Sequence, residues 1–241
     1  FVVVFRIFGM FLSVDDPYVE TALYIIAAVT MTMGNLMALS QTDIKRMLAF
    51  SSISHAGFVL AAILIGSTQA TIGIFVYWTL FAIANLGAFG MLGLNRNKSA
   101  AINGYAQNTV ESYAGLVKKS PMTAAIFAMF LLSLAGVPPF SVFWGKFYLI
   151  GSAVNEGYLY LALIMALNSA VAAYYYIKPI VYMFFKEAVP SSDEAKNEIL
   201  TNSTTMLKSV IGVFVLLTVA SIFLVEPLIE FASYYVQMSG Y

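Results

Sequence analysis

Long, uninterrupted runs of apolar residues dominate the chain, and short polar segments separate them. Each full run covers roughly 17 residues or more, the length that an α-helix needs to cross the hydrocarbon core of a bilayer. The runs are continuous rather than alternating, which argues against a transmembrane β-barrel. We therefore predict an all-α transmembrane helix bundle. The predicted complete spans cover residues 21–40, 47–65, 71–94, 121–151, 158–185 and 209–225.

The first apolar run, residues 1–14, is too short to cross a bilayer and begins with Phe1 rather than Met. We interpret it as the second half of a helix that starts upstream. The prediction is therefore six complete spans plus one truncated span. Since no polar linker exceeds roughly 26 residues, residues 1–241 are expected to form a single transmembrane domain.

Basic and non-basic loops alternate along the whole chain. Lys and Arg gather in three loops, whereas the loops between them and the C-terminal tail carry acidic residues or no charge. By the positive-inside rule, the three basic loops are expected on the cytoplasmic side. These loops are 41–46, 95–120 and 186–208.

The span 121–151 is too long for one upright helix and contains Ala-Gly-Val-Pro-Pro at 135–139. Proline cannot donate a backbone hydrogen bond, and the residue before it avoids the α region. We predict two half-helices, about 121–135 and 140–151, with a break inside the membrane. Such breaks are tolerated where they line a cavity, and they recur in ion transporters. The preceding segment, 101–119, fits either an interfacial connector or an ordinary loop.

Composition supports a membrane protein: 61% of the residues are hydrophobic, 10% are charged, and the mean hydropathy is +0.85. Twelve Lys and Arg balance twelve Asp and Glu, so no excess charge points to a nucleic acid partner. The chain has no Cys and one His. It therefore cannot supply Cys ligands for an iron–sulfur cluster, a bis-histidine haem site or a His-rich zinc site.

Lys146 lies a few residues after the double proline, among apolar and aromatic residues. A buried ammonium is costly in hydrocarbon, so an intramembrane lysine usually faces a polar interior and has a function. We predict that Lys146 carries protons. The alternative is a lysine that extends its amine to the membrane interface.

His55 lies near the middle of its predicted span. Ser51 and Ser52 precede it by four and three residues, so the three side chains share one helix face. Histidine titrates near neutral pH and can relay protons. A histidine that only bonds a neighbouring helix is an equally acceptable interpretation.

Other polar residues are weaker candidates. Lys45 begins the helix that carries His55, and Lys178 precedes Pro179 near the cytoplasmic end of its span. Either lysine could contribute to proton transfer, or could instead set topology or reach the interface. Three asparagines inside spans are expected to face the bundle and hold helices together. They are Asn35, Asn85 and Asn168.

Two strings are highly specific. The first runs from Gly34 to Phe58 and includes SQTDIKRMLAFSSISHAGF, and the second is LAGVPPFSVFWGKFY at 134–148. Together they closely resemble the antiporter-like membrane subunits of complex I, the proton-translocating NADH–quinone oxidoreductase, and most closely the subunit N group. Tyr-Ala-Gly-Leu at 113–116 and the three tyrosines at 174–176 match as well.

The resemblance implies a fourteen-helix fold built from two inverted repeats, of which this chain would be the C-terminal part from the eighth helix to the fourteenth. The segment 121–151 would be the second broken helix. Lys146 would be the family's lysine there, and His55 the histidine of the tenth helix. The span 71–94 lacks the Lys or His that some sister subunits have, so its relay would depend on Tyr77, Asn85 and water.

The resemblance also implies a function: a proton-translocating subunit in the cytoplasmic (inner) membrane of a bacterium. NADH, FMN, iron–sulfur clusters and quinone would be bound by partner subunits, with no cofactor on this chain. The partners would be other complex I membrane subunits, including neighbouring antiporter-like subunits, and the lipid bilayer. The alternative is a subunit of a multisubunit sodium/proton antiporter or of a membrane-bound hydrogenase.

Overall fold

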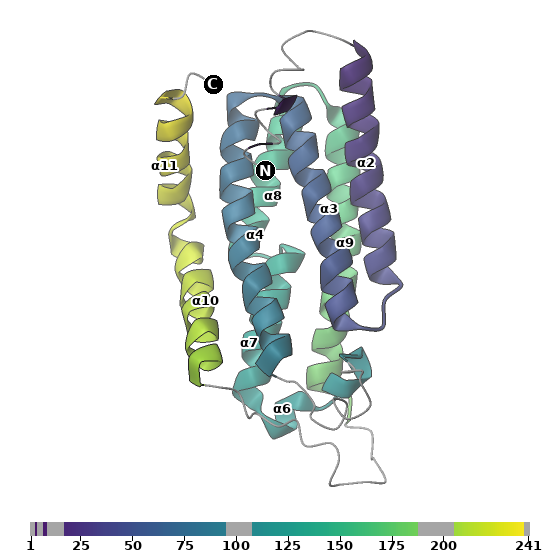
Figure 1. Ribbon diagram of the computed structural model, residues 1–241, viewed down its shortest axis with the longest axis vertical. Helices are drawn as coiled ribbons and strands as arrows, with labels where there is room; N and C mark the ends of the chain where they lie inside the picture. Colours follow the sequence, from purple (N-terminus) through teal and green to yellow (C-terminus); the bar gives the residue numbers. More distant parts are fainter. Residues whose placement is uncertain (1–2, 4–6, 9–16, 95–107, 188–204, 239–241) are drawn as a thin grey trace.

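A computed structural model of the chain describes residues 3, 7–8, 17–94, 108–187 and 205–238. Within these ranges the regular structure is helical (Figure 1). The long helices run nearly parallel or antiparallel to one another and form a bundle. The elements are α2 (Pro17–Leu39), α3 (Ile44–Ile65), α4 (Thr68–Leu94), the 3-10 helix η1 (Val110–Tyr113), α6 (Leu116–Lys119), α7 (Pro121–Ala135), α8 (Ser141–Asn155), α9 (Leu159–Phe185), α10 (Thr205–Phe223) and α11 (Val225–Met238).

In the part of the chain that the structure describes, five helices are long and apolar enough to cross a membrane: α2, α3, α4, α9 and α10. They coincide with five of the predicted spans to within a few residues at each end, so the chain has the architecture of a multi-pass membrane protein. The predicted truncated span, 1–14, lies almost entirely outside the described residues.

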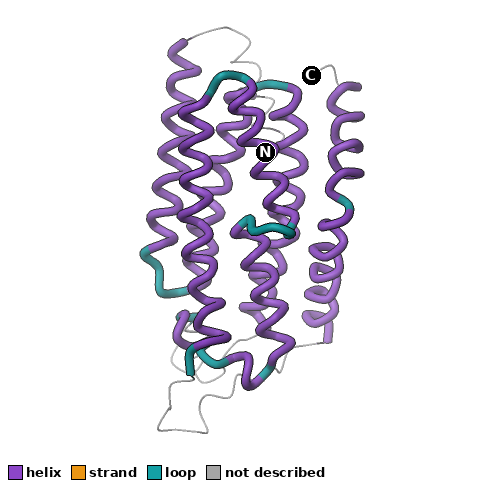
Figure 2. The backbone as a smooth tube through the Cα atoms, turned by 180° about the vertical axis from the view of Figure 1, so that it is seen from behind, coloured by secondary structure: helices purple, strands orange, loops and turns teal. Residues whose placement is uncertain are grey.

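The predicted break in 121–151 is confirmed as the junction between α7 and α8. Gly136 ends α7 in the left-handed conformation, at φ 78°, and its N–H bonds back to α7 carbonyls. A residue with a Cβ disfavours this conformation, so glycine suits the position. Pro138 and Pro139 follow and cannot continue the helix. Figure 2 shows the connecting loop near half the height of the bundle.

One helix was not predicted from the sequence. After α10 ends at Phe223, the chain continues as α11, which also packs against α4. Figure 1 shows the two helices following one another along one edge of the bundle. The reason for the interruption is Pro227, which has no N–H to offer the Phe223 carbonyl four residues earlier and whose ring clashes with it.

The described parts of the basic loops lie at one end of the bundle. The backbone N–H of Ile44 donates to Asn108 O (2.8 Å), and that of Val110 donates to Thr42 O (2.9 Å). The N–H of Gly115 donates to Tyr182 O near the end of α9 (3.2 Å). The described part of the connector, 108–119, is therefore packed against the bundle and is not a free loop, and its Val110 and Tyr113 side chains are buried.

The non-basic loops meet at the opposite end. Asn155 Nδ2 donates to Gln69 Oε1 (2.9 Å), which joins the end of α8 to the start of α4. The Tyr158 hydroxyl donates to Glu20 Oε1 (2.7 Å). Partial burial, together with this hydrogen bond, raises the pKa of Tyr158 to about 12. The charge alternation read from the sequence thus corresponds to two distinct ends of one bundle.

Close helix packing brings α2 and α3 together. A Cβ on Gly57 would lie 2.5 Å from Met31 Cγ and 2.7 Å from Met31 N, and one on Gly34 would lie 2.7 Å from Ser54 N. Small residues let backbones approach in this way in membrane helix pairs. The contact holds α3 in the interior, where its polar residues are surrounded by other helices.

Candidate functional site

The Lys146 side chain is buried in the middle of the bundle, as predicted, with only 4% of its surface exposed. It lies in the second turn of α8, and its ammonium returns across the break to the end of α7. Nζ donates to Ala135 O (3.1 Å) and to Leu134 O (3.3 Å). The last four carbonyls of a helix lack intrahelical partners and carry partial negative charge, so they are suitable acceptors for a cation.

The break is shaped around this lysine. A Cβ placed on Gly136 would lie 3.1 Å from Lys146 Cδ and 3.3 Å from Nζ. Glycine therefore serves two purposes here, since it permits the left-handed turn and leaves room for the lysine chain. The segment that ends α7 is thus also the wall of the lysine site.

An aromatic layer connects Lys146 to His55. Lys146 Nζ lies 5.8 Å from the ring centroid of Phe58, within the range of a cation–π interaction. The Phe58 ring is in turn 6.5 Å from that of His55, and His55 stacks on Phe81 with centroids 4.2 Å apart. The two predicted residues therefore share a neighbour, one helical turn from His55 on α3.

Both ring nitrogens of His55 contact tyrosine hydroxyls. Nδ1 is 2.5 Å from the Tyr77 hydroxyl on α4, and Nε2 is 3.4 Å from the Tyr176 hydroxyl on α9. A neutral imidazole has one donor and one acceptor nitrogen, and a phenol can donate or accept. The arrangement therefore accommodates either tautomer of His55, and its side chain is 3% exposed.

Polar contacts lie beside Tyr176 on the same side of α9. The rings of Tyr176 and Tyr175 pack against each other, with centroids 4.7 Å apart. The Tyr175 hydroxyl donates to Asn35 Oδ1 (2.9 Å), and Asn35 Nδ2 donates to Asn168 Oδ1 (2.8 Å). Asn35 and Asn168 thus join α2 to α9, as expected for asparagines in membrane helices. This pair holds Tyr175, whose ring packs against Tyr176, the partner of His55 on α9.

Asn85 extends the polar stripe of α4. It lies two turns beyond Tyr77, with Phe81 between them, and its Oδ1 is buried without a hydrogen-bond partner among the described residues. Buried polar atoms are nearly always satisfied, and ordered water is the usual partner when protein is not. A relay through Tyr77, Asn85 and water stays a prediction.

The structure does not bring the two weaker lysine candidates into this cluster. Lys45 is exposed in the first turn of α3, and its Cα is about 15 Å along the helix axis from that of His55. Lys178 is half-buried and lines a shallow groove on α9 with Tyr174 and Val181. Any role of these lysines in proton transfer stays a prediction.

Tyr175 and Tyr176 are the residues whose contribution to the site sequence reasoning missed. The three consecutive tyrosines at 174–176 match the family strings, but a helical pattern alone does not say which of them points inward. In the structure Tyr174 is 67% exposed, whereas Tyr175 and Tyr176 are almost fully buried. Asn168, two turns earlier on α9, is the signal that marks the inward face.

Residues 1–172 match a protein family described as NADH:quinone oxidoreductase/Mrp antiporter, transmembrane. The chain belongs to this family. Among its relatives is the NADH-quinone oxidoreductase subunit N of a Sulfurovum species, which is 48% identical over 241 residues and is aligned to the whole chain and to 48% of its own length. The chain spans about half the length of the curated relatives it matches.

Solved structures of the family have the same fold. A chain of respiratory complex I from Thermus thermophilus superposes with a TM-score of 0.70 at 27% identity, covering 87% of this chain and 45% of that one. A chain of the Mrp complex from a Dietzia species gives a TM-score of 0.81 at 20% identity, covering 98% and 50%. At that identity the Dietzia match supports the fold alone.

Proposed function

We propose that the chain is the C-terminal part of a proton-translocating membrane subunit of a respiratory NADH–quinone oxidoreductase. The observation that carries this proposal is the Lys146 ammonium, buried at the break between α7 and α8 and linked through Phe58 to His55. The names of the relatives support the assignment to subunit N and to complex I. The chain would lie in a bacterial cytoplasmic membrane beside other antiporter-like subunits.

In this proposal the redox chemistry takes place elsewhere. Electrons pass from NADH to quinone through FMN and iron–sulfur clusters on partner subunits, and this chain moves protons only. Residues 121–155, built from α7 and α8, would form one further crossing besides the five long helices. The described helices would then belong to the eighth to fourteenth helices of the whole subunit.

The proton step follows from the contacts. Protonated Lys146 is held by the carbonyls of Leu134 and Ala135. When a second cation approaches along the bundle axis, like charges favour the neutral form of the lysine, and Lys146 releases its proton. His55 and its tyrosine partners can accept and donate protons in turn, since each hydroxyl is both donor and acceptor. Water at Asn85 would extend the path.

The test is substitution of Lys146 in the intact complex. Lys146→Ala and Lys146→Met should lower proton pumping by about a hundredfold, the smaller end of what a positioned acid–base group contributes. Lys146→Arg should also impair pumping, because arginine essentially never deprotonates. Pumping would be followed by dye quenching in vesicles, alongside quinone reductase activity and a check of assembly.

Lys118→Ala is the control, since Lys118 is exposed and its ion pair among the described residues is with the exposed Glu187 (3.4 Å). It should leave pumping unchanged. An assembled Lys146→Met complex that pumps at the wild-type proton-to-electron ratio would show that Lys146 is not part of the path.

A sodium/proton antiporter subunit is the second candidate, because the family description includes Mrp antiporters. A membrane-bound hydrogenase subunit is a third candidate. Proton uptake by the same vesicles separates the antiporter from complex I. Proton uptake driven by a sodium gradient in the absence of NADH and quinone favours the antiporter, and uptake driven by NADH oxidation favours complex I.

A further inference from the structure

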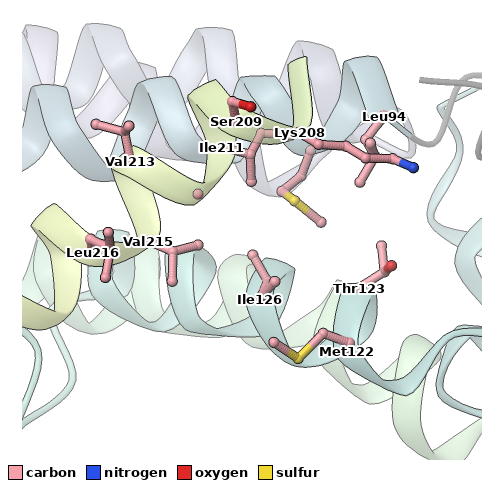
Figure 3. Close-up of a pocket in the computed structure, with 12 residues that line it drawn as sticks. Leu94, Met122, Thr123, Ile126, Lys208, Ser209, Ile211, Val213, Val215 and Leu216 are labelled. Atoms are coloured by element: carbon pink, nitrogen blue, oxygen red, sulfur yellow. The ribbon is translucent and has the colours of Figure 1, made fainter. Parts of the chain in front are cut away.

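An open groove runs between α10, α7 and the end of α4, away from the lysine site (Figure 3). Its volume is about 530 Å³, within the range of small-molecule pockets. The interior is apolar, and Ile126, Ile211, Val215 and Leu216 line it. Few residues of α10 are buried against the rest of the chain. The side of α10 that lines the groove is apolar, so water at membrane depth would not fill the groove favourably.

One end of the groove is polar and positively charged. Lys208, Thr123 and Leu94 lie at this end, and Leu216 lies toward the other. The polar end is the end of the bundle where the basic loops meet, the level of lipid headgroups. Among the described residues no carboxylate forms an ion pair with Lys208.

The dimensions match a lipid acyl chain. From Lys208 to Leu216 the groove follows α10 for about 12 Å, most of the thickness of one hydrocarbon leaflet. A phosphodiester at the rim would meet the Lys208 ammonium, and anionic lipids are attracted to basic residues at this level of the membrane. A chain at hydrocarbon depth would contact apolar side chains only.

We propose that this groove binds one anionic phospholipid, with its phosphate at Lys208 and one acyl chain between α10 and α7. The bound chain would complete the packing of α10 on the bundle. This site is independent of Lys146 and of the proposed proton transfer.

Two substitutions test the binding of a lipid in the groove. A Cβ on Gly212 would have no atom within 4 Å, so Gly212→Phe can place its ring in the groove without a clash. Lys208→Gln removes the charge at the rim and keeps a side chain of similar length. Leu217→Phe, on an exposed part of α10 that does not line the groove, and Lys186→Gln, an exposed lysine at the same end of the bundle, are the matched controls.

The experiment uses membranes that contain the intact complex, loaded with phosphatidylglycerol that carries a photoreactive diazirine in its acyl chain. Crosslinked peptides are mapped by mass spectrometry, and the exposed face of α9 around Leu163 and Leu167 reports ordinary lipid contact. A phosphatidylcholine probe with the same chains tests the headgroup.

We expect groove peptides to be labelled more strongly than the α9 face, and more strongly by phosphatidylglycerol than by phosphatidylcholine. Gly212→Phe should abolish the excess with both probes, and Lys208→Gln should lower the preference for phosphatidylglycerol about fivefold, the effect of one basic residue near the surface. Labelling equal to that of α9 and unchanged by Gly212→Phe would overturn the proposal. An unlabelled groove would also overturn it, and would indicate that a polypeptide covers it.

Discussion

At the scale of single residues, two tyrosine hydroxyls determine the surroundings of His55. Tyr77 contacts one ring nitrogen and Tyr176 the other, and each hydroxyl comes from a different helix. A histidine used only for packing needs one partner to satisfy its donor. Partners on both nitrogens give a continuous route through the ring, because one nitrogen can receive a proton while the other gives one up.

Replacing either hydroxyl should therefore slow proton transfer without unfolding the subunit. Tyr77→Phe or Tyr176→Phe keeps the ring and leaves one polar atom of His55 without its partner, which costs about 1–3 kcal/mol. Pumping in vesicles should fall for both variants while the amount of assembled complex stays close to wild type. Tyr174→Phe, at the exposed neighbour of Tyr176, should have no effect. Equal pumping by all three variants would exclude the tyrosines from the path.

At the scale of helices and their junctions, the broken pair α7–α8 gives Lys146 its environment. The sequence predicted this break well, because prolines and glycine act locally through backbone geometry. It also predicted that Lys146 and His55 are buried, since an ionisable group in an apolar run is costly when it faces lipid and usually faces the bundle interior. It did not predict α11, because a short amphipathic helix such as Val225–Met238 acquires its stability from packing on α4, which only the fold reveals.

The junction can be tested with two glycines that share a backbone conformation. Gly136 and Gly157 both have positive φ, 78° and 84°. An alanine at either position costs about 1–2 kcal/mol of backbone strain. Only at Gly136 does the new methyl group press on the Lys146 side chain, since nothing lies within 4 Å of a Cβ on Gly157.

We therefore expect Gly136→Ala and Gly157→Ala to lower thermal stability by similar amounts, measured as the melting temperature of the complex. Gly136→Ala alone should reduce proton pumping. Pumping that is equally reduced in both variants would mean that strain, and not the displacement of Lys146, is responsible.

At the scale of the whole molecule, the two ends of the bundle differ in charge and in the loops that bond to each other. We predict that the end with the basic loops faces the cytoplasm. Single cysteines at Thr42 and Lys186, both exposed at this end, should react with an impermeant maleimide only when it is added from the cytoplasmic side. A cysteine at Glu156 should react only from the opposite side. Labelling of Thr42→Cys and Glu156→Cys from the same side would contradict this topology.

The position of the break has an electrical consequence. Since α7 and α8 have 15 residues each, the Lys146 ammonium lies near the midpoint of the membrane's voltage drop. A proton that moves between this point and either surface crosses about half of the potential, about 1.2 kcal/mol for 100 mV, or roughly a sevenfold change in the occupancy of the site. Lys146 would thus divide the work of charging the membrane into two nearly equal steps. A complex working against a high potential would then slow at the filling and the emptying of this site alike.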